Sequence, residues 1–111
     1  MPETIDIQLK KGVLSLCVLA VLARHESYAY EIASNLSAAI GMGEGTIYPL
    51  MRRMQGDGLV ATYLVESSTG PSRKYYKLTP AGQAALAAQR SEWLGFARAV
   101  DALLEPTPQE A

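Results

Sequence analysis

The chain has 111 residues, the length of one ordinary domain, and 49% of them are hydrophobic, which excludes a disordered low-complexity segment. Its formal net charge of −1 excludes a strongly basic or acidic protein, so bulk charge points to no class of partner. The distribution is less even: residues 44–77 carry five basic and three acidic side chains, whereas residues 78–111 carry two and four. This mildly basic middle fits a binding face, and an ordinary solvated surface explains it equally well.

The N-terminal residues 1–12 are acidic before they are basic, and they lack the layout of a signal peptide. The apolar run Val13–Ala23 is too short to cross a bilayer, which takes about 20 residues. The single cysteine, Cys17, lies in this run; it cannot form an intramolecular disulfide, and we expect a small buried hydrophobe. We therefore expect a soluble cytoplasmic protein.

Two helices are predicted in the first 40 residues. The first covers Lys10–Arg24, and its apolar side chains surround nearly the whole circumference, which indicates burial on several sides. Ser27 is a suitable N-cap for a second helix over Tyr28–Ile40, whose apolar residues recur four apart. Glycines at positions 41, 43 and 45 then mark a turn.

A third helix, from about Glu44 to Gln55, contains a proline at position 49. A proline in a helix interior removes a backbone hydrogen bond and costs about 3 kcal/mol. If the helix begins at residues 44–46, however, Pro49 lies in or just beyond the first turn, where N–H groups have no internal partner. The proline therefore places the start of a short helix with Thr46 and Tyr48 on its opening turn. We expect Tyr48 to face outward, because other side chains already supply an apolar stripe.

Two short strands follow, Leu59–Val65 and Arg73–Leu78, both rich in β-branched or aromatic residues. The segment Glu66–Ser72 between them reads as a flexible turn, which predicts a hairpin with a long loop. Side chains alternate along a strand, so one of Tyr75 and Tyr76 must point inward.

Thr79 and Pro80 provide an N-cap and a proline at the first position of a fourth helix, which runs from Ala81 to about Glu105. Its seam residues are spaced by seven, with a second set three residues after the first: Leu86, Trp93 and Val100, then Gln89, Phe96 and Leu103. This is close to a coiled-coil seam with one polar position, which indicates a dimer contact, and we expect the protein to dimerise through the first and fourth helices.

The order of helix, helix, helix, hairpin and long helix is that of a winged helix-turn-helix, a mainly α (α+β) fold. In this geometry the third helix enters the major groove of DNA by its N-terminal residues, and flanking elements grip the backbone. Arginine suits both tasks, because it reads guanine and also contacts phosphate. The candidate DNA-binding residues are Thr46, Tyr48, Arg52 and Arg53 on the third helix and Arg73 and Lys74 on the hairpin.

Four segments together resemble the PadR family of winged-helix transcriptional regulators: YAYEI at 28–32, EGTIYPL at 44–50, GLV at 58–60 and GPSRKYYKLTPAG at 70–82. The GTIYPL and RKYYKLT blocks are specific in combination, whereas either alone is modest evidence. The resemblance spans residues 9–105. Because the chain has a single C-terminal helix, it resembles the family's small subgroup. The resemblance implies a homodimeric repressor with palindromic operators, built from a winged-helix DNA-binding domain (1–78) and a dimerisation helix and tail (79–111).

Trp93 has two interpretations. On a long amphipathic helix a lone tryptophan is usually a packing anchor, here between subunits. In small PadR-like regulators a tryptophan on this helix can instead form a flat wall of a drug-binding pocket between protomers, and Phe96 lies one turn on. Aromatic planes of this kind suit planar apolar or cationic compounds, so a small aromatic effector is the corresponding partner.

Other classes of function have little support. His25 is the only histidine, and one histidine with one cysteine makes neither a zinc site nor a Cys–His nucleophile. The glycines at 41, 43 and 45 lack the preceding strand that a phosphate loop needs. We therefore expect no enzyme activity, no cofactor and no metal. The remaining alternative is a winged-helix module that uses the same surface to bind protein instead of DNA. For Arg52 and Arg53 the plain interpretation is an exposed helix face with salt bridges.

Overall fold

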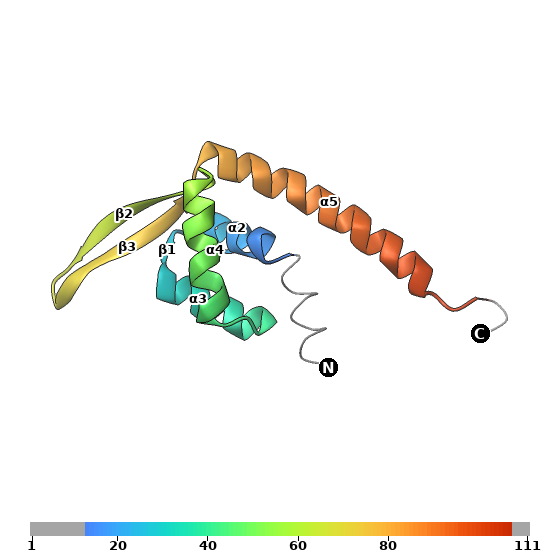
Figure 1. Ribbon diagram of the computed structural model, residues 1–111, viewed down its shortest axis with the longest axis horizontal. Coiled ribbons are helices and arrows are strands. Elements are labelled where there is room, and N and C mark those ends of the chain that lie inside the picture. Colours follow the sequence, from blue (N-terminus) through green and yellow to red (C-terminus); the bar gives the residue numbers. More distant parts are fainter. Residues whose placement is uncertain (1–12, 108–111) are drawn as a thin grey trace.

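The computed structural model describes residues 13–107, which form a body with two projections, a β-hairpin and a long C-terminal helix (Figure 1). The predicted start of the first helix at Lys10 lies outside the described residues. The elements are α2 (Leu14–Arg24), β1 (Ser27–Tyr28), α3 (Ala29–Ile40), α4 (Glu44–Gly56), β2 (Val60–Ser67), β3 (Gly70–Leu78) and α5 (Pro80–Leu104). Their order along the chain is that of the expected winged helix-turn-helix.

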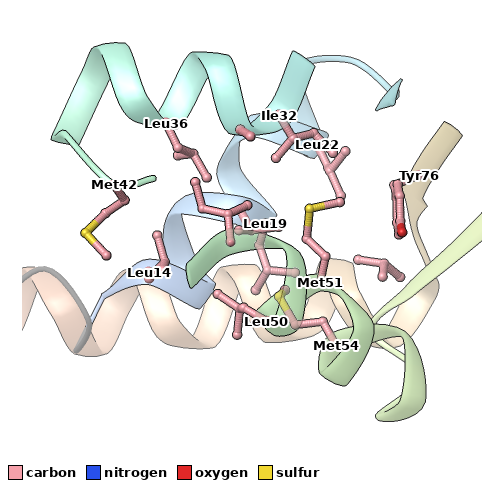
Figure 2. Packing of buried hydrophobic residues seen from close by; sticks show 14 of the residues in the cluster. Leu14, Leu19, Leu22, Ile32, Leu36, Met42, Leu50, Met51, Met54 and Tyr76 are labelled. Atoms are coloured by element: carbon pink, nitrogen blue, oxygen red, sulfur yellow. The ribbon is translucent and has the colours of Figure 1, made fainter. Parts of the chain in front are cut away.

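Helices α2, α3 and α4 enclose the hydrophobic core (Figure 2). Leu19 of α2, Ile32 of α3 and Met51 of α4 are fully buried in it, and Tyr76 of β3 packs at one side. Because α2 contacts α3, α4, β3 and α5, its predicted burial on several sides is confirmed. Cys17 is only half-buried, and this burial raises the pKa of its thiol.

Ser27 does not cap the second helix, so that prediction is wrong. It belongs to the two-residue strand β1, which pairs with β3 through Ser27 opposite Tyr76 and Tyr28 opposite Tyr75. The strand pairing buries Ser27 completely, and its hydroxyl lies 2.9 Å from Nδ1 of His25 instead of reaching the helix. Tyr28 occupies the N-cap position without a side-chain capping bond, and α3 begins at Ala29.

Helix α4 begins at Glu44 with Gly43 at its N-cap position. Its first i→i−4 hydrogen bond runs from the N–H of Ile47 to the carbonyl of Gly43 (3.2 Å). Pro49 lies just beyond this turn, where an ordinary residue would donate to the carbonyl of Gly45. The helix therefore gives up one backbone bond close to its start, and it continues to Gly56.

The hairpin is longer and its turn shorter than predicted. Strands β2 and β3 pair from Val60 opposite Leu78 to Ser67 opposite Gly70, so the connection is the two-residue turn 68–69 and not a seven-residue loop. Pro71 lies inside β3, beside a register shift between Val65 and Ser67. An irregularity of this kind accommodates a residue that has no N–H to donate. We call this hairpin, residues 60–78, the wing.

Helix α5 is capped as predicted. The Thr79 hydroxyl accepts a hydrogen bond from the N–H of Gly82 (3.0 Å) and donates one to the carbonyl of Gly58 (2.6 Å), and Pro80 is the first helical residue. The first part of α5 packs along α2, with Leu86 buried, and the distal part extends beyond the body (Figure 1). Among residues 13–107, no helix has the length and apolar character needed to span a membrane.

Candidate nucleic-acid interface

The exposed face of α4 carries two arginines. Its buried face consists of Ile47, Leu50, Met51 and Met54, so Arg52 and Arg53 lie on the opposite side and are exposed. Their guanidinium groups are therefore accessible to a partner.

Thr46 and Tyr48 lie on opposite edges of this face, and both are half-buried. Thr46 lines a hollow with Arg53 and the start of α2, whereas Tyr48 lines a hollow with Tyr30 and the wing. The four predicted residues of α4 therefore divide between two edges of the helix. Arg52, one turn after Tyr48, lies nearer the wing side.

Tyr48 combines packing with an accessible edge. One side of its ring packs against the core. Burial is the main cause that raises the pKa of its hydroxyl, and the nearby Glu44 and Tyr30 raise it further. The phenol is therefore neutral at ordinary pH and available as a hydrogen-bond donor.

The two predicted wing residues are both exposed and project from opposite faces of β3. The guanidinium carbon of Arg73 lies 4.6 Å from the centroid of the Tyr28 ring, on the face that also carries Tyr75. Lys74 is on the other face, with its Nζ 5.8 Å from the centroid of Tyr76. The wing thus presents one cation from each of its faces.

Three tyrosine rings form a row across the sheet that the sequence analysis did not foresee. Tyr75 lies between Tyr28 and Tyr63, with ring centroids 5.5 Å and 5.8 Å away. The Tyr63 hydroxyl donates to a carboxylate oxygen of Glu26, and this hydrogen bond is the main cause that raises the pKa of Tyr63. Tyr76 is the inward-facing residue of its pair. The row joins the wing to the segment that starts α3, so it fixes how the wing leaves the body.

Among the described residues, the basic side chains of α4 and the wing have no acidic partner. Within residues 13–107 the close contact between a basic and an acidic side chain is that of His25 Nδ1 with Glu31, at 3.9 Å. The side chains free of such a contact include Arg52, Arg53, Arg73, Lys74 and Lys77. Their charge is therefore not neutralised within the described chain, which favours an anionic partner.

Trp93 and Phe96 are exposed on α5 and lie near the start of α2. They border a hollow of about 440 Å³ together with Val13, Ser15, Leu16, Gln89 and Glu92. An aromatic ligand or a second apolar surface could occupy such a place. In the described part of the chain no group of three or more His, Cys, Asp or Glu residues could hold a metal ion.

The chain matches known proteins over most of its length. The family model for the transcriptional regulator PadR-like family matches residues 18–88. A transcriptional regulator of Mycobacterium tuberculosis is 30% identical over 94 residues, covering 84% of this chain and 87% of that protein.

Solved structures of PadR-family regulators have the same fold as this chain. A PadR-like transcriptional regulator from Bacillus cereus superposes with a TM-score of 0.82 at 37% identity, covering 90% of this chain and 99% of that one. A PadR family regulator from Eggerthella lenta also gives 0.82, at 31% identity, covering 95% and 93%. The mainly α winged-helix fold is therefore confirmed, and the chain belongs to the PadR-like family of transcriptional regulators.

Proposed function

We propose that this PadR-like regulator binds duplex DNA as a homodimer and represses transcription at palindromic operators. The observation that carries the proposal is the exposed set of basic side chains on α4 and the wing, which have no acidic partner among residues 13–107. Phosphate oxygens of DNA are the anions that such side chains bind. A regulator of this kind works in the cytoplasm, and no catalytic role is proposed.

On this proposal α4 enters the major groove. Thr46 and Tyr48 offer hydroxyl groups from the two edges of the helix, and Arg52 and Arg53 read bases or bind adjacent phosphates. Arg73 and Lys74 bind the phosphate backbone beside the groove. The free guanidinium and ammonium groups support this division of roles.

The proposed dimer contact is made by residues 79–111, and residues 1–78 bind DNA. Large apolar side chains are exposed along the distal part of α5, among them Phe96, Leu103 and Leu104. Contiguous exposed apolar residues at seam spacing favour burial against a second copy. In such a dimer the two α4 helices lie about 34 Å apart, one turn of DNA.

A planar aromatic effector is proposed to bind beside Trp93 and Phe96 and to weaken the DNA complex. The hollow that these rings border supports this role, and the dimer contact would enclose it further. Titration of a panel of planar dyes should quench Trp93 fluorescence and lower affinity for DNA. A panel that leaves the fluorescence unchanged would instead favour a packing role for Trp93 between subunits.

The test of DNA binding is fluorescence anisotropy with a labelled duplex of arbitrary sequence at low salt. The wild-type chain should bind, and the double variant Arg52→Gln/Arg53→Gln should bind more weakly. The matched control is Arg90→Gln/Arg98→Gln, which removes two exposed arginines of α5. Absence of binding at low salt would favour the alternative, a winged helix that binds protein. Selection of bound genomic fragments would then give the operator and test its palindromic symmetry.

A further inference from the structure

A hollow of about 570 Å³ lies where the wing meets the helix-turn-helix. Its lining comes from β1, α3, α4 and β3 and consists of Tyr28, Ala29, Tyr30, Tyr48, Arg73 and Lys74. None of these six residues is acidic, two are cations and three carry phenolic hydroxyls. The carboxylate of Glu44, which helps to raise the pKa of Tyr48, lines the neighbouring hollow on the α3 side instead.

The hydroxyls of Tyr28, Tyr30 and Tyr48 have no hydrogen-bond partner among residues 13–107, and we take Tyr30 and Tyr48 as the donors because the Tyr28 ring is already engaged by Arg73. Tyr30 is 62% exposed, although it is a large aromatic residue on the first turn of α3. The Tyr63 hydroxyl differs, because it is already bonded to Glu26. Tyr30 and Tyr48 thus add two neutral donors to the two cations.

Tyr28 holds Arg73 in a defined position. The guanidinium lies over the face of the ring, 4.6 Å from carbon to centroid, and an arginine stacked in this way keeps its in-plane N–H donors free. Tyr28 is itself held by Tyr75, 5.5 Å away, and by the pairing of β1 with β3. The Tyr28 ring therefore holds the N–H donors of Arg73 in a fixed position.

We propose that this hollow holds one phosphate of the DNA backbone, bound by Tyr30, Tyr48, Arg73 and Lys74, with Tyr28 as the positioning residue for Arg73. The inference rests on the proposed DNA binding and adds Tyr30 and Tyr28 to it. A phosphodiester fits the lining because it is an anion with acceptor oxygens only, which suits cations and neutral hydroxyl donors together. The contact reads no sequence; it fixes the wing relative to the groove that α4 enters.

The first experiment removes single hydroxyls from the full chain. Tyr30→Phe and Tyr48→Phe keep the rings and their packing, so both variants should keep the wild-type melting temperature. Each should weaken binding to a labelled duplex about tenfold, the low end for a hydrogen bond to a charged group. The slope of log affinity against log salt should not change, because a neutral donor releases no counterion. Lys74→Gln should instead reduce that slope by about one.

The control is Tyr63→Phe, which also deletes one tyrosine hydroxyl of the winged domain. Its hydroxyl bonds Glu26 and does not line the hollow. This variant should bind DNA within about twofold of wild type, since surface changes away from a contact have small effects.

The second experiment tests the positioning role of Tyr28. Tyr28→Phe keeps the aromatic face and should bind as wild type, whereas Tyr28→Leu should weaken binding about fivefold by releasing Arg73. Arg73→Ala should then cost less affinity in the Tyr28→Leu background than in wild type. A purely structural role for Tyr28 would leave the effect of Arg73→Ala the same in both backgrounds, and would overturn the positioning role.

The outcomes separate this inference from the proposed function. If wild type binds duplex DNA and Arg52→Gln/Arg53→Gln weakens it, but Tyr30→Phe and Tyr48→Phe behave as Tyr63→Phe does, the phosphate site is wrong and DNA binding stands. If wild type does not bind duplex DNA at low salt, the proposed function fails and the phosphate site with it.

Discussion

The body and the distal part of α5 both carry leucines at helical spacing, but these leucines end in opposite environments. In the body Leu19 is fully enclosed within the protomer, whereas on α5 Leu103 is 85% exposed. Phe96 and Leu104 of α5 are also exposed. The comparison teaches that the same residue type completes a core in one region and is left without one in the other, where we propose a second copy supplies the missing surface.

The largest expected effect tests this comparison directly. Leu19→Ala should lower the free energy of unfolding by about 2–5 kcal/mol, because it leaves a cavity in a closed core. Leu103→Ala should lower it only through weaker self-association, so its effect should depend on protein concentration. Chemical denaturation at several concentrations, with analytical ultracentrifugation, measures both. A loss for Leu103→Ala that is large and independent of concentration would remove the distinction.

The second prediction concerns the junction between the two regions. A Cβ added at Gly82 would lie 2.0 Å from the carbonyl oxygen of Leu59, so Gly82→Ala must push the start of α5 away from the body. We expect a loss of about 1–3 kcal/mol of unfolding free energy, as for overpacking.

Gly95 provides the matched control on the same helix. A Cβ there meets nothing within 4 Å, and Gly95→Ala should stabilise α5 by up to about 1 kcal/mol through helix propensity. Thermal melts of the two variants should therefore shift in opposite directions. A shift in the same direction would mean that the close approach at Gly82 does not hold α5 to the body.

Local signals were enough to predict most of the helices and one cap. The periodicity of α3 and α4 and the Thr79–Pro80 start of α5 depend on residues within a turn or two of each other. Ser27 failed as a cap because β1 exists only through pairing with Tyr75 and Tyr76, which are far along the chain. A short strand without an alternating pattern of its own leaves no local signal.

The wing shows the same limit. Gly70, Pro71 and Ser72 are typical loop residues, yet they belong to β3 because pairing with β2 and a register shift accommodate the proline. The row of Tyr28, Tyr75 and Tyr63 depends on that register. Residue type alone predicted that one tyrosine of the pair would face inward, but not which one.

For the candidate site, the sequence could predict the elements and the residue types but not the grouping of the side chains. Thr46 and Tyr48 share one turn of α4 but are two residues apart, so helix geometry directs them to opposite edges. Only the folded chain shows that the start of α2 borders the first edge and the wing borders the second. Tyr30 was not predicted as a site residue, because the sequence analysis used its segment, residues 28–32, only as part of the resemblance to the family. Only the folded chain brings Tyr30 beside Tyr48 and the wing.

A third, smaller effect tests the cap of α5. Thr79→Ala removes the acceptor for the N–H of Gly82 and the donor to the carbonyl of Gly58, and it should cost about 1 kcal/mol of unfolding free energy. Thr79→Ser keeps the hydroxyl and should cost less. Denaturation curves measured side by side give the difference, and equal losses for both variants would mean that the methyl group, not the cap, matters.

The last prediction should leave stability almost unchanged and change only the response to salt. Arg73 and Lys74 are exposed, so their joint replacement by Ala should lower the free energy of unfolding by no more than about 1 kcal/mol, the size of an exposed cation–π contact. Binding to all duplex sequences should weaken, and the slope of log affinity against log salt should fall by up to about two, since two cations that bind backbone phosphate are lost.

Arg90→Ala/Arg98→Ala, which removes the same charge from α5, should leave that slope unchanged. An unchanged slope for the wing variant as well would show that the wing does not bind phosphate. With the expected result, the two projections differ in the partner that each requires. The unpaired cations of the wing bind an anion, whereas the exposed leucines of the distal part of α5 pack against an apolar surface. Salt should therefore weaken the contact of the wing and not that of α5.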